Sequence, residues 1–290
     1  MTYGTIVVCG GGCYGGYYVR QLARARAAGA LQLERILVVD RDEHCPMARL
    51  VHAIRADDQP AMLESGWRVQ RADALREVPV PEIGYRGLPI SFIGSDWQSF
   101  FTEWFQRAIA APDLAQRDAV VPSPLMPHLL SDWVESRVRM HQPGGRVERV
   151  PMSVAMATPW QRDALDLAHY ASFATWMCPI NCIEPPRCPE TRGPRDWTMP
   201  VAVRTAVDDA ARLGTPYQVV ALFQTSHRSY GVGMFDVTDA LAAEASIARQ
   251  ADREHLRLLV ASVSHCHGAL AELVCDRAAA DRTAGASSGR

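Results

Sequence analysis

The stretch Thr5-Ile6-Val7-Val8-Cys9-Gly10-Gly11-Gly12-Cys13-Tyr14-Gly15-Gly16 decides how the first part of the chain folds. Its β-branched residues predict a short buried strand, and its glycines predict a sharp turn into a helix. Gly10, Gly12 and Gly15 have the spacing G-x-G-x-x-G. In this pattern the first glycine allows the turn, the second lets the backbone approach a pyrophosphate, and the third lets helix and strand pack closely. We therefore expect a dinucleotide to bind at these three glycines.

A second strand is predicted after the helix, over Arg35-Ile36-Leu37-Val38-Val39-Asp40. The N–H groups at the start of the intervening helix attract phosphate. A carboxylate at the end of the second strand accepts hydrogen bonds from a ribose diol and repels a 2′-phosphate, so Asp40 favours NAD over NADP. Arg41 beside it keeps NADP open as the cofactor. A glycine turn that binds no ligand would show the same spacing.

This segment resembles the nucleotide-binding domain of the TrkA-N type, within the Rossmann superfamily. The matching residues are Val8-Cys9-Gly10-Gly11-Gly12 and Val38-Val39-Asp40-Arg41-Asp42, and the resemblance extends over roughly residues 1–45. It implies NAD-type binding by Gly10, Gly12, Gly15 and Asp40. The chain departs from the family at Cys13, where such domains often carry arginine.

Two further strands and an aromatic helix are predicted in the rest of the N-terminal half. The strands cover Trp67–Gln70 and Asp118–Pro122, and Ser95-Asp96-Trp97 predicts the start of the helix. Phe100, Phe101, Trp104 and Phe105 then recur at helical spacing. Such aromatic residues are typical of a core or a dimer contact, so a homodimer is one expectation. His128 follows the later strand, at the strand end where ligands bind in open α/β sheets. An ordinary loop histidine would occupy the same place.

The C-terminal half predicts strands over residues 151–157 and 217–223, and then one long helix. His227 follows the second of these strands, again at a position that favours ligand binding. From about residue 252 to 275, apolar residues recur at steps of three and four, which predicts a helix with Cys266 on its buried face and His267 at its edge. Residues 277–290 are small and polar, and we expect a disordered tail there.

The segment Cys178-Pro179-Ile180-Asn181-Cys182-Ile183-Glu184-Pro185-Pro186-Arg187-Cys188-Pro189 gathers three cysteines among four prolines. Proline neither continues a helix nor donates to a strand ladder, so a rigid loop is predicted. Three interpretations are open: an iron–sulfur cluster, a structural zinc site, and unligated thiols that pack or exchange. A metal would take Cys178, Cys182 and Cys188 and needs a distant fourth ligand, for which the candidates are Cys266, His267 and His227.

The composition describes an ordinary globular protein. The net charge is −2 and the hydrophobic fraction 48%, which gives no sign of nucleic-acid binding. No apolar run reaches the roughly 18 residues of a membrane-spanning helix, and no targeting segment precedes the first strand, so we expect a cytoplasmic protein. Eight cysteines in that compartment are expected to be free, metal-bound or redox-active. The chain contains no lysine, which excludes Schiff-base catalysis.

Together these features predict an α/β fold: a Rossmann-like, doubly wound, mostly parallel sheet with a cysteine-rich insertion and a C-terminal helix. The expected parts are a dinucleotide-binding domain over 1–157, a remainder over 158–276 packed on the same sheet, and the tail. The leading hypothesis is an NAD(P)-dependent oxidoreductase with a metal or iron–sulfur centre beside the nicotinamide. His128 or His227 would move the proton that accompanies hydride transfer to a small-molecule substrate or redox partner. The alternative is a non-enzymatic NAD(H)-binding sensor with a structural zinc or a redox-sensing cysteine loop.

Overall fold

The computed structural model describes residues 1–56, 85, 87–123, 128–174 and 182–277. The chain forms two compact units. The N-terminal unit comprises residues 1–125 and 226–238, and the C-terminal unit comprises residues 126–225 and 239–290. These boundaries differ from the expected division at residue 157.

The N-terminal unit is built on a six-stranded mixed sheet. Its strands, in spatial order, are β3 (Ile90–Gly94), β2 (Gln32–Asp40), β1 (Thr2–Cys9), β4 (Ala119–Val121), β10 (Gly233–Asp236) and β9 (Ser226–His227). The first four strands run parallel, whereas β10 is antiparallel to β4 and β9 is antiparallel to β10. The predicted strands over 35–40 and 118–122 are therefore confirmed as β2 and β4, and the predicted strand at Trp67–Gln70 lies outside the described residues.

The helices of this unit follow the strands they connect. They are α1 (Cys13–Ala27), α2 (Pro46–Ala56), α3 (Trp97–Ala110), the short α4 (Pro112–Ala115) and a 3-10 turn, η1 (Ser229–Gly231). Asp96 caps α3 as predicted, because its side chain accepts a hydrogen bond of 2.9 Å from the Ser99 amide. The aromatic stripe of α3 is buried within the single chain, so of the two expectations for it the core contact is confirmed.

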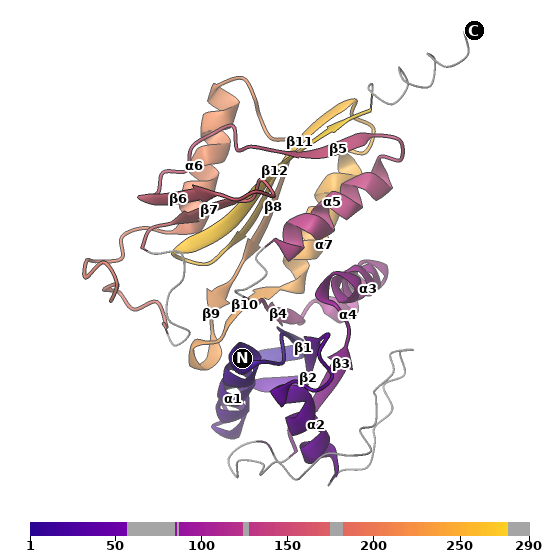
Figure 1. Cartoon of the computed structure of the whole chain (residues 1–290), viewed down its shortest axis with the longest axis vertical. Coiled ribbons are helices and arrows are strands. Elements are labelled where there is room, and N and C mark those ends of the chain that lie inside the picture. The colour runs from indigo at the N-terminus through magenta and orange to yellow at the C-terminus, as the bar shows by residue number, and fades with distance from the viewer. Residues whose placement is uncertain (57–84, 86, 124–127, 175–181, 278–290) are drawn as a thin grey trace. The chain divides into compact units, whose positions relative to one another are not determined.

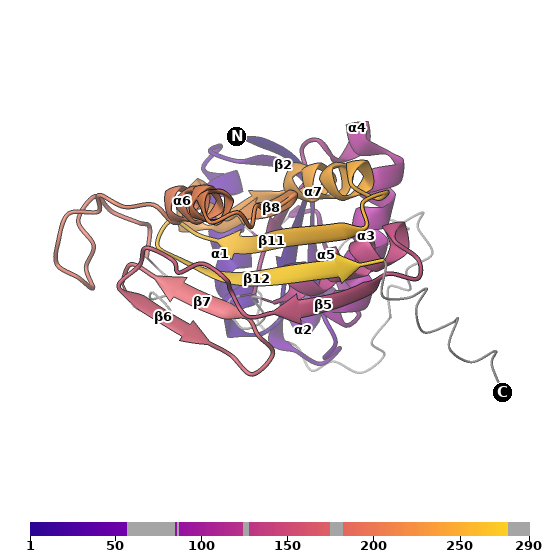
Figure 2. The same cartoon turned by 90° about the horizontal axis from the view of Figure 1, so that it is seen from above.

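The C-terminal unit has a separate mixed sheet. Its strands run in the order β6 (Trp160–Asp163), β7 (His169–Ser172), β12 (His267–Asp276), β11 (His255–Val263) and β8 (Val219–Gln224), and β5 (Arg146–Val150) also pairs with β12. Only β8 and β11 run parallel among these pairs. Figure 2 shows β7, β12 and β11 side by side. The expectation of one shared sheet is thus wrong: the structure has two.

Three helices belong to or enter this unit: α5 (Leu129–His141), α6 (Met199–Arg212) and α7 (Val237–Arg249). Met199 and Val203 of α6 pack with Leu259 of β11 in one apolar core. Trp133 of α5 meets Phe223 of β8 edge to face, with ring centroids 6.3 Å apart. Figure 1 shows α5 and α6 on opposite sides of this sheet, so its central strands are covered on both faces.

The predicted C-terminal helix over 252–275 is wrong, because this segment folds as the antiparallel hairpin β11–β12. A strand covered on both faces is apolar along almost its whole length, and such a run matches helical spacing as well as strand spacing. The strand expected over 151–157 is also wrong, because β5 ends at Val150 and residues 151–157 form no strand. The predicted strand over 217–223 is confirmed as β8. Among the residues described, no helix combines the length and apolar character needed to cross a membrane.

Replacing Gly15 by alanine should strongly destabilise the N-terminal unit. A Cβ atom on Gly15 would overlap the carbonyl oxygen of Gly10, whereas a Cβ atom on Gly12 would meet nothing within 4 Å. Overpacking of this kind typically costs about 1–3 kcal/mol. We expect Gly15→Ala to lower the midpoint of urea unfolding clearly and Gly12→Ala to change it little. Equal midpoints for the two variants would contradict the packing described here.

A buried ion pair between α5 and α7 should make the C-terminal unit sensitive to acid. Arg137 Nε donates to Glu244 Oε2 at 2.7 Å, and His141 Nε2 lies 2.7 Å from Glu244 Oε1. Burial alone would raise the pKa of Glu244, but the hydrogen bonds from Arg137 and His141 hold the pKa below its ordinary value. The stabilisation is therefore complete above the unfolded-state pKa and is lost as pH falls through the lower folded-state pKa.

Glu244→Gln should remove this pH dependence and also leave Arg137 buried without a counter-charge, a change that costs about 3–5 kcal/mol. We expect a much less stable protein at pH 7 and a flatter loss of stability between about pH 5 and 3, measured by thermal unfolding. Glu103→Gln is the matched control, because Glu103 is 60% exposed and pairs only with Arg107 in the next turn of α3. If Glu244→Gln lost stability with falling pH as steeply as the unsubstituted protein does, the acid sensitivity would not come from this ion pair.

Candidate functional site

The glycine turn joins β1 to α1 in the N-terminal unit. Gly10 adopts a φ of +98°, which favours glycine, and its amide donates to the Val39 carbonyl at 2.8 Å. Gly12 is the N-cap of α1 and supplies no side-chain cap. The first amides of a helix have no partner within the helix. The start of α1 therefore presents N–H groups, and the space beside Gly12 is open.

Asp40, at the end of β2, is tied to this turn. Its Oδ2 accepts a hydrogen bond of 2.7 Å from the Gly11 amide, and its Oδ1 accepts one of 2.9 Å from the Asp42 amide. A carboxylate offers about four acceptor positions, so each oxygen keeps capacity for another donor. The side chain is only partly buried. Asp40 is thus both a structural anchor of the turn and a fixed acceptor beside it.

The turn is packed from two sides by residues that sequence reasoning missed. The Cys45 sulfur lies so close to Gly11 that a Cβ atom there would overlap it. On the other side, the Trp97 indole N–H donates to the Val39 carbonyl at 2.9 Å, and its ring lies 3.4 Å from where a Cβ atom of Gly10 would stand. The sequence pattern assigns Trp97 only to the start of a helix. A tryptophan three residues after the end of β3 was the available signal for an aromatic surface next to the turn.

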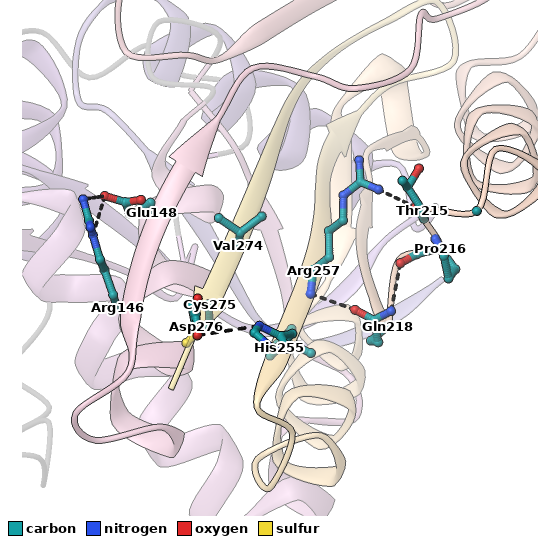
Figure 3. A pocket seen from close by; sticks show the side chains of 12 residues that line it. Arg146, Glu148, Thr215, Pro216, Gln218, His255, Arg257, Val274, Cys275 and Asp276 are labelled. Carbon is teal, nitrogen blue, oxygen red and sulfur yellow. Dashed lines mark hydrogen bonds and ion pairs between the residues drawn. The ribbon is translucent and has the colours of Figure 1, made fainter. Parts of the chain in front are cut away.

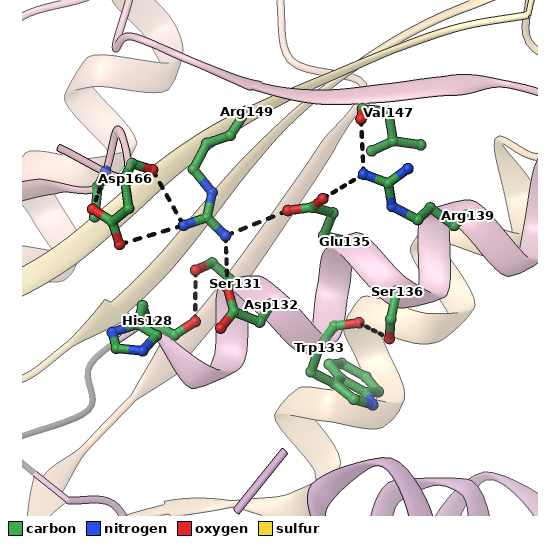
Figure 4. A network of polar contacts seen from close by, with 11 residues as sticks. His128, Ser131, Asp132, Trp133, Glu135, Ser136, Arg139, Val147, Arg149 and Asp166 are labelled. Carbon is green, nitrogen blue, oxygen red and sulfur yellow. Dashed lines mark hydrogen bonds and ion pairs between the residues drawn. The ribbon is translucent and has the colours of Figure 1, made fainter. Parts of the chain in front are cut away.

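The two candidate proton-transfer histidines belong to different units. His227 lies in β9, opposite Gly233 of β10, and is partly buried. His128 precedes α5, where its carbonyl accepts a hydrogen bond of 2.7 Å from the Ser131 hydroxyl (Figure 4). Of the pair, only His227 shares a unit with the glycine turn.

Near His128, the guanidinium of Arg149 joins several acidic groups. It donates to Asp132 at 2.7 Å and to Glu135 at 3.4 Å, and it lies 3.7 Å from Asp166 (Figure 4). These contacts hold β5 against α5. The network has the character of a structural ion cluster, because the arginine is already matched by carboxylates.

In the C-terminal unit, the cysteine loop meets the turn between β11 and β12. Cys188 and Cys266 are both 1% exposed. Arg195 lies with them, and its Nη1 donates to the Cys266 sulfur. The Glu184 carboxylate accepts the His265 amide at 3.2 Å. The cysteine loop is therefore held against the turn that carries Cys266, and a role for Cys266 as a metal ligand stays a prediction.

The two thiols of this cluster differ in acidity. Burial would raise the pKa of Cys188. Hydrogen bonds from the Thr191 and Glu190 amides and from the Thr191 hydroxyl oppose this effect, as does the charge of Arg195. The net result is a pKa below the usual value. Burial raises the pKa of Cys266 to about 11, although Arg195 and Trp197 oppose the rise. Cys188 therefore carries the greater thiolate character.

The described residues of this cluster do not form a metal site. Within the described ranges, no three side chains of His, Cys, Asp or Glu converge as metal ligands. The guanidinium of Arg195 already occupies the side of Cys266, and a cation there disfavours a metal ion. Cys178 lies outside the described residues, Cys182 is partly buried, and His267 is the first residue of β12. A centre that includes Cys178 stays a prediction.

A shallow pocket of about 480 Å³ opens at one end of the C-terminal sheet (Figure 3). Its charged residues are already paired: Arg146 donates to Glu148 at 2.7 Å, and Arg257 lies 2.6 Å from Glu272. Glu272 is 2% exposed and also accepts the Tyr217 hydroxyl at 2.8 Å. This compensated network stabilises the sheet end and indicates no particular ligand.

Comparison with known proteins gives one match. No curated protein and no solved structure matches the chain. The family model AF_1314_C, described as "Uncharacterized protein, C-terminal domain", matches residues 130–276, which is just over half of the 290 residues. The matched segment holds the cysteine cluster and the hairpin but not the glycine turn. The chain therefore belongs to the AF_1314_C family.

Proposed function

We propose that this chain is an NAD(P)-dependent oxidoreductase whose N-terminal unit is a Rossmann-like nucleotide-binding domain. The observation that carries the proposal is the β1–glycine turn–α1 geometry with Asp40 bonded to the Gly11 amide. This combination supplies N–H groups for a pyrophosphate and a fixed carboxylate for a ribose. The substrate is a small molecule or a redox partner.

The strand order supports this proposal. The parallel strands β3, β2, β1 and β4 follow the order 3-2-1-4, which is that of the first part of a Rossmann sheet. In such sheets the order reverses beside the first strand, and ligands bind in the crevice at the carboxyl ends of the strands there. The glycine turn leaves β1 at this end. The antiparallel strands β10 and β9 depart from the usual pattern.

The charge next to the turn favours NAD over NADP. Asp40 is joined by Asp42 and Glu43 in the connection to α2. Several carboxylates near the ribose would repel a 2′-phosphate, while Asp40 accepts hydrogen bonds from a free diol. Among the two candidate histidines, His227 is the one that this domain itself contributes, and it would move the proton that accompanies hydride transfer.

A second candidate function is a non-enzymatic NAD(H)-binding sensor. The specific observation in its favour is the contact between the cysteine loop and the β11–β12 turn, with Cys188 and Cys266 both buried. Steady turnover of NADH with any electron acceptor would favour the enzyme, whereas tight binding without turnover across a broad acceptor panel would favour the sensor.

Gly12→Asp should abolish tight NADH binding. A carboxylate at the N-cap of α1 would stand where the pyrophosphate is proposed to bind. Repulsion of about 1–4 kcal/mol corresponds to a loss of affinity between roughly fivefold and several hundredfold. The open space at Gly12 means that the variant should still fold. Fluorescence titration with NADH measures the effect, and Gly12→Ala is the neutral control, with a small change. Unchanged affinity of Gly12→Asp for NADH would contradict the proposed nucleotide site.

Asp40→Asn should shift cofactor preference toward NADPH. The amide keeps one acceptor oxygen but removes the negative charge that would oppose a 2′-phosphate. We expect the ratio of NADPH to NADH affinity to rise by about tenfold, or ~1.4 kcal/mol. Glu34→Gln is the control, because Glu34 is exposed and pairs with Arg117 at 2.6 Å on the same sheet. A ratio that moves equally in both variants would argue against a role for Asp40 in cofactor choice.

A further inference from the structure

The environment of Trp97 differs from that of three other tryptophans in this chain. Trp104 stacks on Phe100 with ring centroids 5.7 Å apart, and Trp133 and Trp197 each pack against a phenylalanine. Among the described residues, no aromatic ring or cation lies on the Trp97 indole. The side chain is only partly buried. An aromatic face that the described protein leaves uncovered is available to a ligand.

The Trp97 side chain is held at the end of β2 from two directions. Gly94, the last residue of β3, pairs with Asp40, and the Ser95 amide donates to the Asp40 carbonyl at 3.1 Å. The indole N–H of Trp97 donates to the Val39 carbonyl at 2.9 Å. The ring is therefore positioned both by the backbone that leads to it and by its own N–H group.

The same ring borders the glycine turn. Its Cζ2 atom lies 3.4 Å, and its Cη2 atom 3.9 Å, from the place where a Cβ atom of Gly10 would stand. Because this edge meets Gly10 and the N–H group meets Val39, the part of the indole left for a ligand is its flat face. A face that is already fixed loses little conformational entropy when a ligand binds to it.

The proposed nucleotide site determines which group would reach this face. Asp40 is proposed to bind the ribose that carries a free 2′-hydroxyl in NAD and a 2′-phosphate in NADP. In both cofactors adenine is attached directly to that ribose, so the base must lie close to Asp40. Val39, whose carbonyl holds the indole, is the residue immediately before Asp40.

The charge at this edge of the sheet also favours a neutral base. Asp40, Asp42 and Glu43 are carboxylates near the end of β2, and a Cβ atom on Gly94 would overlap the Glu43 carboxylate. A further phosphate would be repelled here. Adenine is uncharged at neutral pH and offers an amino group to acceptors. Its attraction to an aromatic side chain comes from stacking, which needs no charge.

We propose that Trp97 is the stacking platform for the adenine base of the bound nucleotide. This inference rests on the proposed nucleotide site and adds to it a residue that selects for an aromatic base. ADP-ribose, which retains the adenine, the adjacent ribose and both phosphates of NAD but lacks the nicotinamide, carries every group needed for this contact. It is therefore the probe for the test.

The test compares the full-length protein with two Trp97 variants by calorimetric titration with ADP-ribose. Trp97→Ala removes the stacking face and should weaken binding roughly 5- to 150-fold, the range typical of base–aromatic stacking. Trp97→Phe keeps an aromatic face but loses the N–H bond to Val39, and it should weaken binding less than about fivefold. Equal losses in the two variants would overturn the proposal, because the N–H bond would then account for the whole effect.

Tryptophan fluorescence supplies a readout that a purely structural role would not change. Contact with a stacked purine quenches indole emission, so ADP-ribose should quench the fluorescence of the wild-type protein. Trp97→Phe should still bind ADP-ribose but lose this quenching. Trp160→Phe is the matched control, since Trp160 is also partly buried but lies on β6 of the C-terminal unit. It should keep both the affinity and the quenching.

Failure of this inference and failure of the proposed function give different results. If the wild-type protein binds NADH and Trp97→Ala binds ADP-ribose with unchanged affinity, the platform is refuted and the nucleotide site stands. If the wild-type protein binds neither NADH nor ADP-ribose, the proposed function fails and the platform fails with it. If Trp97→Ala does not fold, the fluorescence comparison decides: quenching that persists in Trp97→Phe overturns the proposal.

Discussion

The close approach of Gly15 to the carbonyl of Gly10 is the contact on which the N-terminal unit depends. It brings α1 down onto the end of β1, because no side chain separates the helix from the turn. The same approach directs the first amides of α1 into the space beside Gly12, and the Asp40 carboxylate then holds the Gly11 amide in place. This compact backbone is the feature on which the proposal of a nucleotide site rests.

The C-terminal unit concentrates its chemistry at a hairpin turn. Cys266 and His265 lie between two long strands whose interiors are apolar, and the rigid cysteine loop is fastened to them by Glu184 and Arg195. The sheet therefore supports the turn to which the cysteine loop is joined. This is the part of the chain that the AF_1314_C match covers, whereas the glycine turn lies before the matched segment.

The glycine turn, β2, β4, β8 and the capped start of α3 could be predicted because each has a local cause: glycine spacing, β-branched runs, or the Asp96 cap. The hairpin could not, since strands buried on both faces repeat Leu256, Leu259 and Val263 at steps that also fit a helix. The roles of Cys45 and Trp97 depend on tertiary packing against the turn. Cys266 could be named as a candidate partner of the cysteine loop, but it was expected on a helix, whereas the structure places it in the turn between β11 and β12.

The path of the chain has a consequence for how this protein can be divided. It passes between the two units three times, so that β9 and β10 of the N-terminal sheet are supplied by residues 226–238. A fragment that stops at residue 125 would lack both strands and would leave β4, which is fully buried, as an unpaired edge. Exposed apolar edges recruit other strands and promote aggregation. The N-terminal unit is therefore inseparable, by simple truncation, from the part of the chain that carries the cysteine loop.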